Sequence, residues 1–234
     1  MVSNSQLQKL GDRLRKGTPT EADLQMLDEH RASFSGPLGH VVGLVRTLGY
    51  EPSHRQKTQE SIVQKLEREK TNLSRMRDIA GCRFTVDGFN IDGVTAQDRA
   101  VLAIKQILTI VDFEDRRLKP NHGYRAVHLI AEHESRKVEI QIRTKLQDFW
   151  ARLSEGLSAA FPDIKYGGGP DATRQHLLEL SGLCAKLETM QLPISKEEIN
   201  AIDRSVRMTF DSLFATLTPS GLSSPKEDET KRDA

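Results

Sequence analysis

Hydrophobic residues recur at helical spacing over most of the chain and alternate with polar residues over a shorter central part. Apolar side chains three or four positions apart share one face of a helix, whereas strict alternation places them on one face of a strand. The first pattern predicts helices over residues 5–17, 20–49, 58–70, 95–109, 145–161, 171–190 and 195–217. Pro37 and its neighbouring glycines predict an interruption of the second helix within SFSGPLGH (33–40).

Four shorter stretches have the pattern of strands. DIAGCRFTVD (78–87) is apolar and bounded by aspartates, and TIVDFED (109–115) follows the helix that Thr95 is expected to cap. YRAVHLIAEH (124–133) and KVEIQIRT (137–144) come next, joined by a tight polar turn. The order strand, helix, strand, strand, strand predicts an α+β fold, with a mixed but mostly antiparallel β-sheet flanked by helices.

Composition narrows the class of protein. A chain of 234 residues, 37% hydrophobic and 29% charged, has the make-up of a soluble globular protein. We expect one domain over residues 1–217 and a disordered polar tail over 218–234. No apolar run approaches the roughly 20 residues of a membrane helix, and the N-terminus lacks the apolar core of a signal peptide. These features predict a cytoplasmic protein without a membrane partner.

Cysteine content and net charge add two constraints. The two cysteines, Cys82 and Cys184, are too few for a disulfide framework, and we expect Cys82 to be a small core residue. The net charge of +1 argues against DNA as a partner. Any binding of phosphate groups must therefore come from local clusters of lysine and arginine.

The strand KVEIQIRT raises the first question of function. Alternation places its valine and isoleucines on one side, so Glu139, Gln141 and Arg143 must face something polar. Solvent is the ordinary explanation, since an exposed edge strand often carries such residues. The polar residues in the neighbouring segments indicate a binding site instead.

Cationic side chains gather in two segments near this strand. Arg55, Lys57 and Lys65, with Ser61, precede the strand that carries Asp78 and Arg83, and the loop RRLKPNHGYRAVH supplies Arg116, Arg117, Lys119, Tyr124 and His128. Cations that bind phosphate, together with a carboxylate that binds Mg²⁺, are what a nucleoside triphosphate requires. Each residue alone also has an ordinary reading, as part of a solvated helix face, a core aromatic or a structural histidine.

Four blocks together resemble the RelA/SpoT-type alarmone synthetases, a family with a nucleotidyltransferase-like fold. They are SHRQKTQESIVQKLEREK (53–70), MRDIAGCRF (76–84), KPNHGYRAVHL (119–129) and VEIQIRTKLQDFW (138–150). The resemblance covers roughly residues 40–160, and the combination of blocks is far more specific than any one of them. The chain lacks the His-Asp pair of the family's hydrolase domain, so we expect a small synthetase that makes its product without degrading it.

The resemblance implies a GTP/GDP diphosphokinase, in which ATP donates its β,γ-pyrophosphate to the 3′-hydroxyl of GDP or GTP with Mg²⁺ as cofactor. It assigns ATP binding to Arg55, Lys57, Ser61, Lys65 and Arg83. Asp78 is implied as a Mg²⁺ ligand, and Glu139 as either a general base or a second metal ligand. Acceptor binding is assigned to Arg116, Arg117, Lys119, Asn121, Tyr124, His128 and Gln141, with Tyr124 stacking on the base.

One departure leaves the acceptor open. Guanosine-directed members have a longer loop with NPKPNGY, whereas this chain inserts His122 before the glycine and has Arg116 and Arg117 upstream. Some relatives with altered loops and basic patches are toxins that pyrophosphorylate the tRNA 3′ end or adenine nucleotides, and a toxin of this kind would need an antitoxin. Two alternatives to the guanosine-directed enzyme therefore remain open: such a toxin, and a catalytically silent nucleotide-binding module. Assembly into a homo-oligomer is also open at this point.

Overall fold

The computed structural model describes residues 2–87 and 95–189, together with residues 196, 197, 200, 203, 204, 207, 208 and 211. Most of the helix expected over 195–217, and all of the tail expected over 218–234, lie outside the described residues. None of the helices in the described part is long and apolar enough to cross a membrane.

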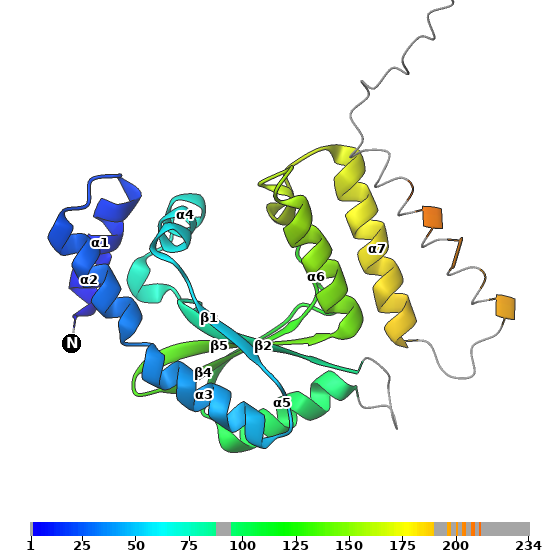
Figure 1. Ribbon diagram of the computed structural model, residues 1–234, viewed down its shortest axis with the longest axis horizontal. Coiled ribbons are helices and arrows are strands. Elements are labelled where there is room, and N and C mark those ends of the chain that lie inside the picture. The colour runs from blue at the N-terminus through cyan, green and yellow to red at the C-terminus, as the bar shows by residue number, and fades with distance from the viewer. Residues whose placement is uncertain are drawn as a thin grey trace, which may run out of the picture.

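A five-stranded sheet in the order β1-β2-β5-β4-β3 forms the centre of the molecule (Figure 1). The strands are β1 (Ser53–Gln56), β2 (Ala80–Val86), β3 (Ile110–Asp115), β4 (Val127–His133) and β5 (Arg136–Thr144). β2 and β5 are parallel and the other three pairings are antiparallel, which confirms the expected fold class. No strand was predicted over residues 53–57, so the sequence patterns missed β1. Its four residues are all polar, so the sequence there lacks the alternation that predicts a strand. The strand is defined by its backbone pairing with β2.

Seven helices and two 3₁₀ turns surround the sheet in the described part of the chain. They are α1 (Asn4–Arg15), α2 (Glu21–Ala32), α3 (Ser35–Thr47), α4 (Gln59–Glu69), η1 (Leu73–Arg75), α5 (Ala96–Ile107), α6 (Lys145–Leu157), η2 (Ile164–Tyr166) and α7 (Asp171–Thr189). Thr95 caps α5 as expected. The expected interruption lies between α2 and α3. Pro37 itself is in the first turn of α3, where no backbone N–H is needed for the helix.

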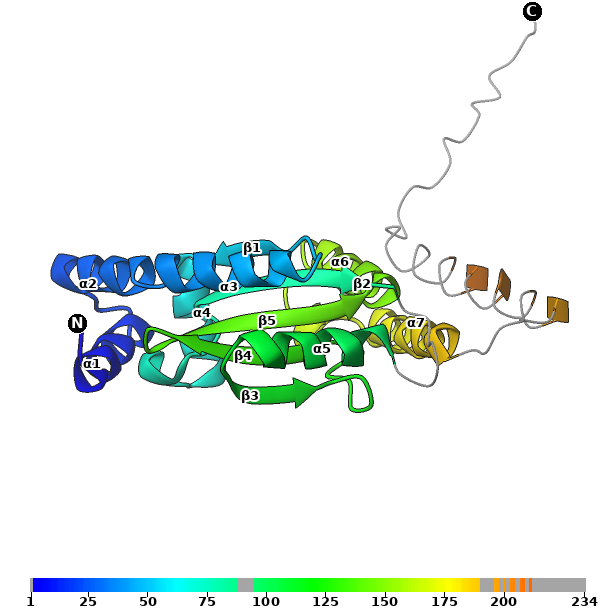
Figure 2. The same ribbon diagram turned by 90° about the horizontal axis from the view of Figure 1, so that it is seen from below.

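The two faces of the sheet have different neighbours. Helices α3 and α5 cover one face and bury the apolar side of β2, β4 and β5, including Cys82 and Phe84 (Figure 2). Burial raises the pKa of the Cys82 thiol to about 12, as expected for an inert core cysteine. Helices α4 and α6 stand on the other face, separated from each other (Figure 1). That face is therefore left open for a site.

A second, smaller core joins α6 to α7. Trp150 is buried there, and its indole N–H donates to the Leu177 carbonyl at 2.7 Å. Gly123 lies against the indole with φ of 90°, a left-handed conformation, and a Cβ at this position would be 2.7 Å from Trp150 Cζ2. Only glycine fits both the backbone angle and the space.

Gly123→Ala should therefore lower the free energy of unfolding by roughly 1–3 kcal/mol, because alanine is strained at positive φ and would displace the indole. The matched control is Gly43→Ala in α3, where the added methyl meets nothing within 4 Å. That change should stabilise the helix by roughly 0.5–1 kcal/mol. Urea unfolding measures both. Equal effects of the two substitutions would contradict the packing described for Gly123.

Candidate functional site

Two rows of side chains cross the open face of the sheet. Residues paired on neighbouring strands point to the same side, and the next residue on that side lies two positions further along. The first row contains, from β1 to β4, Arg55, Gly81, Glu139 and Ile130. The second contains, from β1 to β3, Ser53, Arg83, Gln141, His128 and Glu114. Because β5 is central, an exposed edge strand does not explain its polar face.

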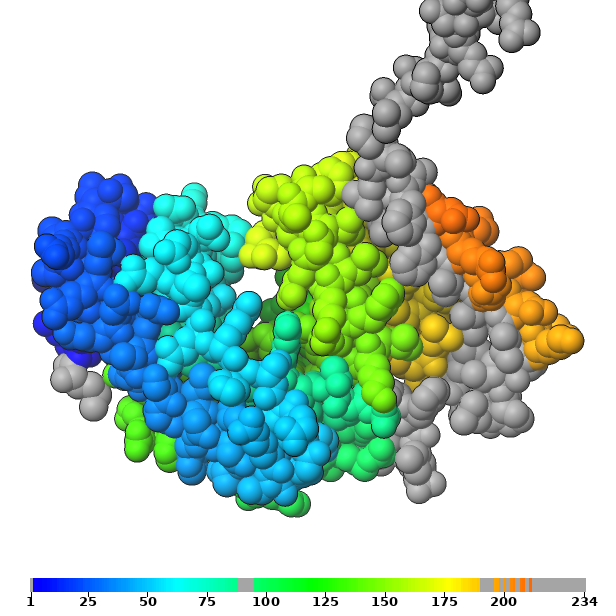
Figure 3. Space-filling view, in the orientation of Figure 1, coloured from blue at the N-terminus to red at the C-terminus, as the bar shows by residue number. Residues whose placement is uncertain are grey.

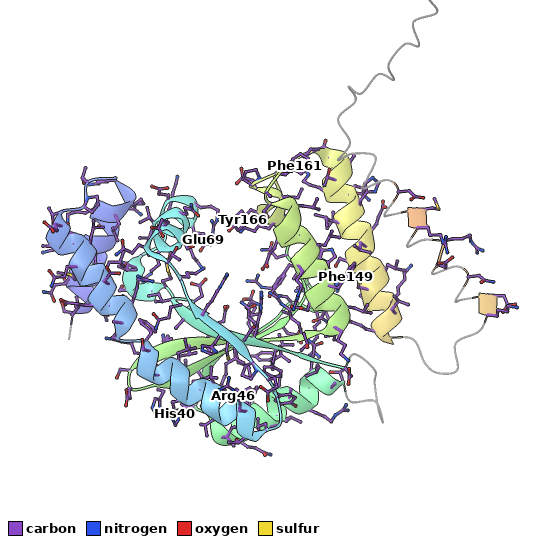
Figure 4. The ribbon with its side chains drawn as sticks, viewed as in Figure 1. His40, Arg46, Glu69, Phe149, Phe161 and Tyr166 are labelled. Atoms are coloured by element: carbon purple, nitrogen blue, oxygen red, sulfur yellow. The ribbon has the colours of Figure 1, made fainter. Side chains whose placement is uncertain are left out.

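The open face is the floor of a cleft whose walls are α4 and α6, visible as a hollow in Figure 3. Glu69 on α4 and Tyr166 on η2 face each other across it (Figure 4). The Arg68 guanidinium lies over the Tyr166 ring, 3.8 Å from its centroid, so the two walls touch at this point. A pocket on this face, between α4 and β3, is lined by these expected site residues: Lys65, Asp78, Arg116, His128 and Glu139.

Asp78 and two lysines form the centre of the wall at α4. Lys65 Nζ donates to Asp78 Oδ2 at 2.7 Å, and Lys57 Nζ lies 3.4 Å from the same oxygen. Ser61 is in the first turn of α4, four residues before Lys65, so both lie on one side of the helix near its N-terminus. Asp78 was expected at the start of a strand, but it precedes the first residue of β2 by two positions.

Arg55 and Arg83 lie further along the face and outside the lining of this pocket. Arg55 is exposed on β1, in the same row as Gly81. Arg83 Nη1 is 3.6 Å from Glu155 Oε1 on α6, at the opposite wall. Their guanidinium groups therefore flank the open side of the cleft, where a planar base could stack.

Glu139 is a half-buried carboxylate with both oxygens engaged. His128 Nδ1 lies 3.0 Å from Oε1, and Gln141 Nε2 donates to Oε2 at 2.7 Å. Burial alone raises the pKa of Glu139, but the His128 hydrogen bond and charge, with Gln141 and Lys65, lower it to about 2. Glu139 is therefore ionised at neutral pH.

Tyr124 stands beside this carboxylate. It was expected in a strand, but it lies before β4, in a backbone bridge with Asn121. Its hydroxyl is 2.9 Å from His128 Nε2. Arg143 was not among the expected site residues, yet it donates to the same hydroxyl at 3.2 Å. The sequence pattern that could have identified Arg143 as a site residue is its position on the polar side of β5.

The basic loop does not converge on the pocket as a unit. Arg116 lines the pocket, and Glu114 accepts two hydrogen bonds of 2.9 Å from its guanidinium. Arg117 turns towards α5 and binds Asp115 and Asp98, which raise its pKa. Lys119 is exposed, outside the lining of the pocket.

Two carboxylates could hold a divalent cation. The described residues contain no cluster of three or more metal-ligating side chains. Asp78 Oδ1 is buried and has no hydrogen-bond partner among the described residues, so it is free to bind a cation. Mg²⁺ is commonly held by one or two carboxylates together with substrate phosphates. Asp78 and Glu139 in one pocket fit that pattern.

Comparison with known proteins relates these elements to one family. Residues 54–162 match a model described as a region found in RelA / SpoT proteins, and they include every expected site residue. An uncharacterised protein of Mycobacterium tuberculosis is 30% identical over 178 residues, 72% of this chain, and the chain spans 64% of that relative's length. The GTP pyrophosphokinase YwaC of Bacillus subtilis is 33% identical over 166 residues, 61% of this chain and 72% of YwaC.

A solved structure shares the fold. Small alarmone synthetase 2 from Bacillus subtilis superposes with a TM-score of 0.51 and 27% identity, covering 79% of this chain and 97% of that one. Helix α7 lies outside the family match, although its core with α6 supports Gly123 beside Tyr124.

The lowered pKa of Glu139 predicts a pH dependence of stability. The ordinary value is 4.5 and the folded value is about 2, so the stabilising contribution is complete above pH 4.5 and lost as pH falls towards 2. At about 1.4 kcal/mol per pKa unit, it is at most about 3.5 kcal/mol. Glu139→Gln should therefore lose less stability than the wild type between about pH 6 and 3 in urea unfolding. The control is Glu132→Gln, which changes an exposed carboxylate. If the unfolding free energy of Glu139→Gln depended on pH as that of the wild type does, the lowered pKa of Glu139 would be contradicted.

Proposed function

Because the chain belongs to the RelA/SpoT family, we propose that it is a pyrophosphokinase that transfers the β,γ-pyrophosphate of ATP to the 3′-hydroxyl of GDP or GTP. The products are AMP and the guanosine tetra- or pentaphosphate. The observation that carries the proposal is the presence of Lys65, Asp78 and Glu139 in one pocket. A similar protein bears the name GTP pyrophosphokinase.

The donor ATP occupies the side of the cleft formed by β1 and α4. Lys57 and Lys65 supply positive charge for its phosphates. Ser61 lies in the first turn of α4, and anions bind favourably at the N-terminus of a helix. Arg55 stacks on the adenine, and Arg83 reaches towards the transferring phosphates from the neighbouring strand. This division keeps the donor at one end of the two rows of side chains.

The transfer depends on position and charge more than on covalent chemistry. The acceptor 3′-oxygen bonds to the β-phosphorus as the bond from that phosphorus to the bridging oxygen of AMP breaks, and the hydroxyl proton is released. Mg²⁺, when bound by Asp78 and Glu139, supplies charge neutralisation for the phosphates. Lys65 holds Asp78 in place through its hydrogen bond. The low pKa of Glu139 suits a carboxylate that orients the 3′-hydroxyl or binds the metal better than it suits a strong base.

The acceptor occupies the other end, beside Tyr124. Its base stacks on the Tyr124 ring, while Arg116 at the pocket supplies charge for its phosphates. Gln141 and His128 adjoin the hydroxyl of the same tyrosine. Arg117 is already paired with two aspartates, which supports a small nucleotide acceptor over a tRNA that needs an extended basic surface.

Removing either carboxylate should abolish transfer without unfolding the protein. Asp78→Asn and Glu139→Gln should each lower kcat by roughly a thousandfold or more, since each loses a charge aimed at the transition state. Asp87→Asn, which alters an exposed carboxylate after the other end of β2, should retain wild-type turnover. Product chromatography with ATP, Mg²⁺ and GDP measures all three. Near wild-type turnover of either site variant would exclude the proposed role.

The acceptor is tested by initial rates with GDP, GTP, ATP and deacylated tRNA at low and near-physiological salt. With a guanosine nucleotide, Tyr124→Ala should weaken acceptor binding by roughly 1–3 kcal/mol and leave ATP binding unchanged. Reversing the charge of Arg117, which is paired with two aspartates away from the pocket, should then matter less than losing the tyrosine. Labelled phosphate in tRNA alone, falling steeply with salt, would replace the guanosine acceptor by the tRNA alternative.

A further inference from the structure

Arg143 is a buried cation next to the proposed acceptor site. It is only 4% exposed, and its Nη1 donates to Asp148 Oδ1 of α6 at 3.1 Å. A buried guanidinium is costly unless it is paired and hydrogen-bonded. Its Nε is buried and has no hydrogen-bond partner in the described part of the chain. Since the fold tolerates this unsatisfied donor, the other contacts of Arg143 indicate a purpose beyond stability.

The remaining nitrogen of Arg143 serves two acceptors. Nη2 donates to the Gln141 Oε1 at 3.0 Å and to the Tyr124 hydroxyl oxygen at 3.2 Å. A guanidinium can donate but cannot accept, so the direction of both hydrogen bonds is fixed. The Gln141 amide must then point its oxygen at Arg143 and its NH₂ at Glu139, where it donates to Oε2 at 2.7 Å.

The second hydrogen-bond chain runs through tyrosine and histidine. Because the Tyr124 oxygen already accepts from Arg143, its own hydrogen is available for a neighbour. His128 Nε2 at 2.9 Å is a better acceptor than Gln141 Oε1 at 3.4 Å. A neutral imidazole that accepts at Nε2 carries its proton on Nδ1, which lies 3.0 Å from Glu139 Oε1. Both chains therefore start at Arg143 and end on the two oxygens of Glu139.

We propose that Arg143 is a positioning residue for the transfer: as a donor with no acceptor capacity, it fixes the direction of two hydrogen-bond chains that converge on Glu139. It thereby sets the tautomer of His128, the amide orientation of Gln141 and the placement of the Tyr124 ring, whose centroid is 5.2 Å from the guanidinium. This inference rests on the proposed function for its meaning, because Tyr124 contacts the acceptor and Glu139 the reacting hydroxyl.

A spectroscopic test does not depend on catalysis. Long-range ¹H–¹⁵N spectra at alkaline pH should show the His128 ring protonated at Nδ1 alone, with the signal assigned from its loss in His128→Gln. In Arg143→Met, the spectra should show His128 as a mixture of the tautomers protonated at Nδ1 and at Nε2. Protonation of wild-type His128 at Nε2, or at both nitrogens, would overturn the proposal. A chain without transfer activity would defeat the proposed function while leaving this measurement valid.

A kinetic test separates positioning from a purely structural role. Arg143→Met should lower kcat on the order of tenfold to a hundredfold, with the KM for ATP unchanged, and Arg143→Lys should recover part of the loss. The matched control is Arg152→Met, since Arg152 binds the other oxygen of Asp148 at 2.6 Å but is exposed. It should behave as wild type. If Arg143→Met or Arg143→Lys loses thermal stability but keeps wild-type kcat, the positioning role is excluded.

Coupling gives a further check. Tyr124→Phe keeps the ring but breaks one chain, whereas Arg143→Met releases both. The double variant should therefore be no slower than Arg143→Met alone. Effects on kcat that simply multiply would mean that Arg143 and Tyr124 act independently, and the proposed chain would be wrong.

Discussion

The parallel pairing of β2 with β5 is the constraint on which the site depends. It is the one parallel pairing among the described strands, and it places Gly81 opposite Glu139. A Cβ at Gly81 would lie 3.0 Å from the Glu139 carbonyl oxygen, so the strands approach closely beside the site. The segment that brings Asp78 and the strand that carries Glu139 come from distant parts of the chain. Their adjacency follows from this pairing, because strands far apart in sequence become neighbours only through the sheet.

Charge at the site is balanced locally, which explains how a chain with a net charge of +1 can bind polyphosphates. Lys57 and Lys65 share one carboxylate, Asp78, and Lys65 also lies 3.6 Å from Glu69 on α4. Arg117 is paired with two aspartates, and the charge of Arg116 at the pocket is partly balanced by Glu114, so the acceptor loop is less basic than its sequence suggests. Positive charge for the donor's phosphates is therefore proposed to come from Lys57 and Lys65 individually, and not from a net positive surface.

Sequence patterns were sufficient for the elements that carry their own signal. Alternation in β5 identified the polar face, and the order of elements identified the fold class. Sequence could not identify β1, whose strand character comes from backbone pairing with β2. It also could not separate Arg116 from Arg117, because neighbouring residues in a loop differ only in which partners the fold offers them. The sequence placed Arg143 on the polar side of β5, but it could not predict that the side chain is buried. That burial depends on an ion pair with Asp148 of α6.

The inserted His122 bears on the acceptor through packing. It has φ of 51°, and its ring lies against Gly167 after η2, where a Cβ would be 2.5 Å from the imidazole. The side chain thus lines a separate cavity beside α7 and not the pocket that contains Glu139. The insertion is accommodated by a glycine from outside the matched family region, while Tyr124 keeps its contact with His128. The unusual loop sequence is therefore compatible with the proposed acceptor site, because His122 lies outside the pocket that contains His128 and Glu139.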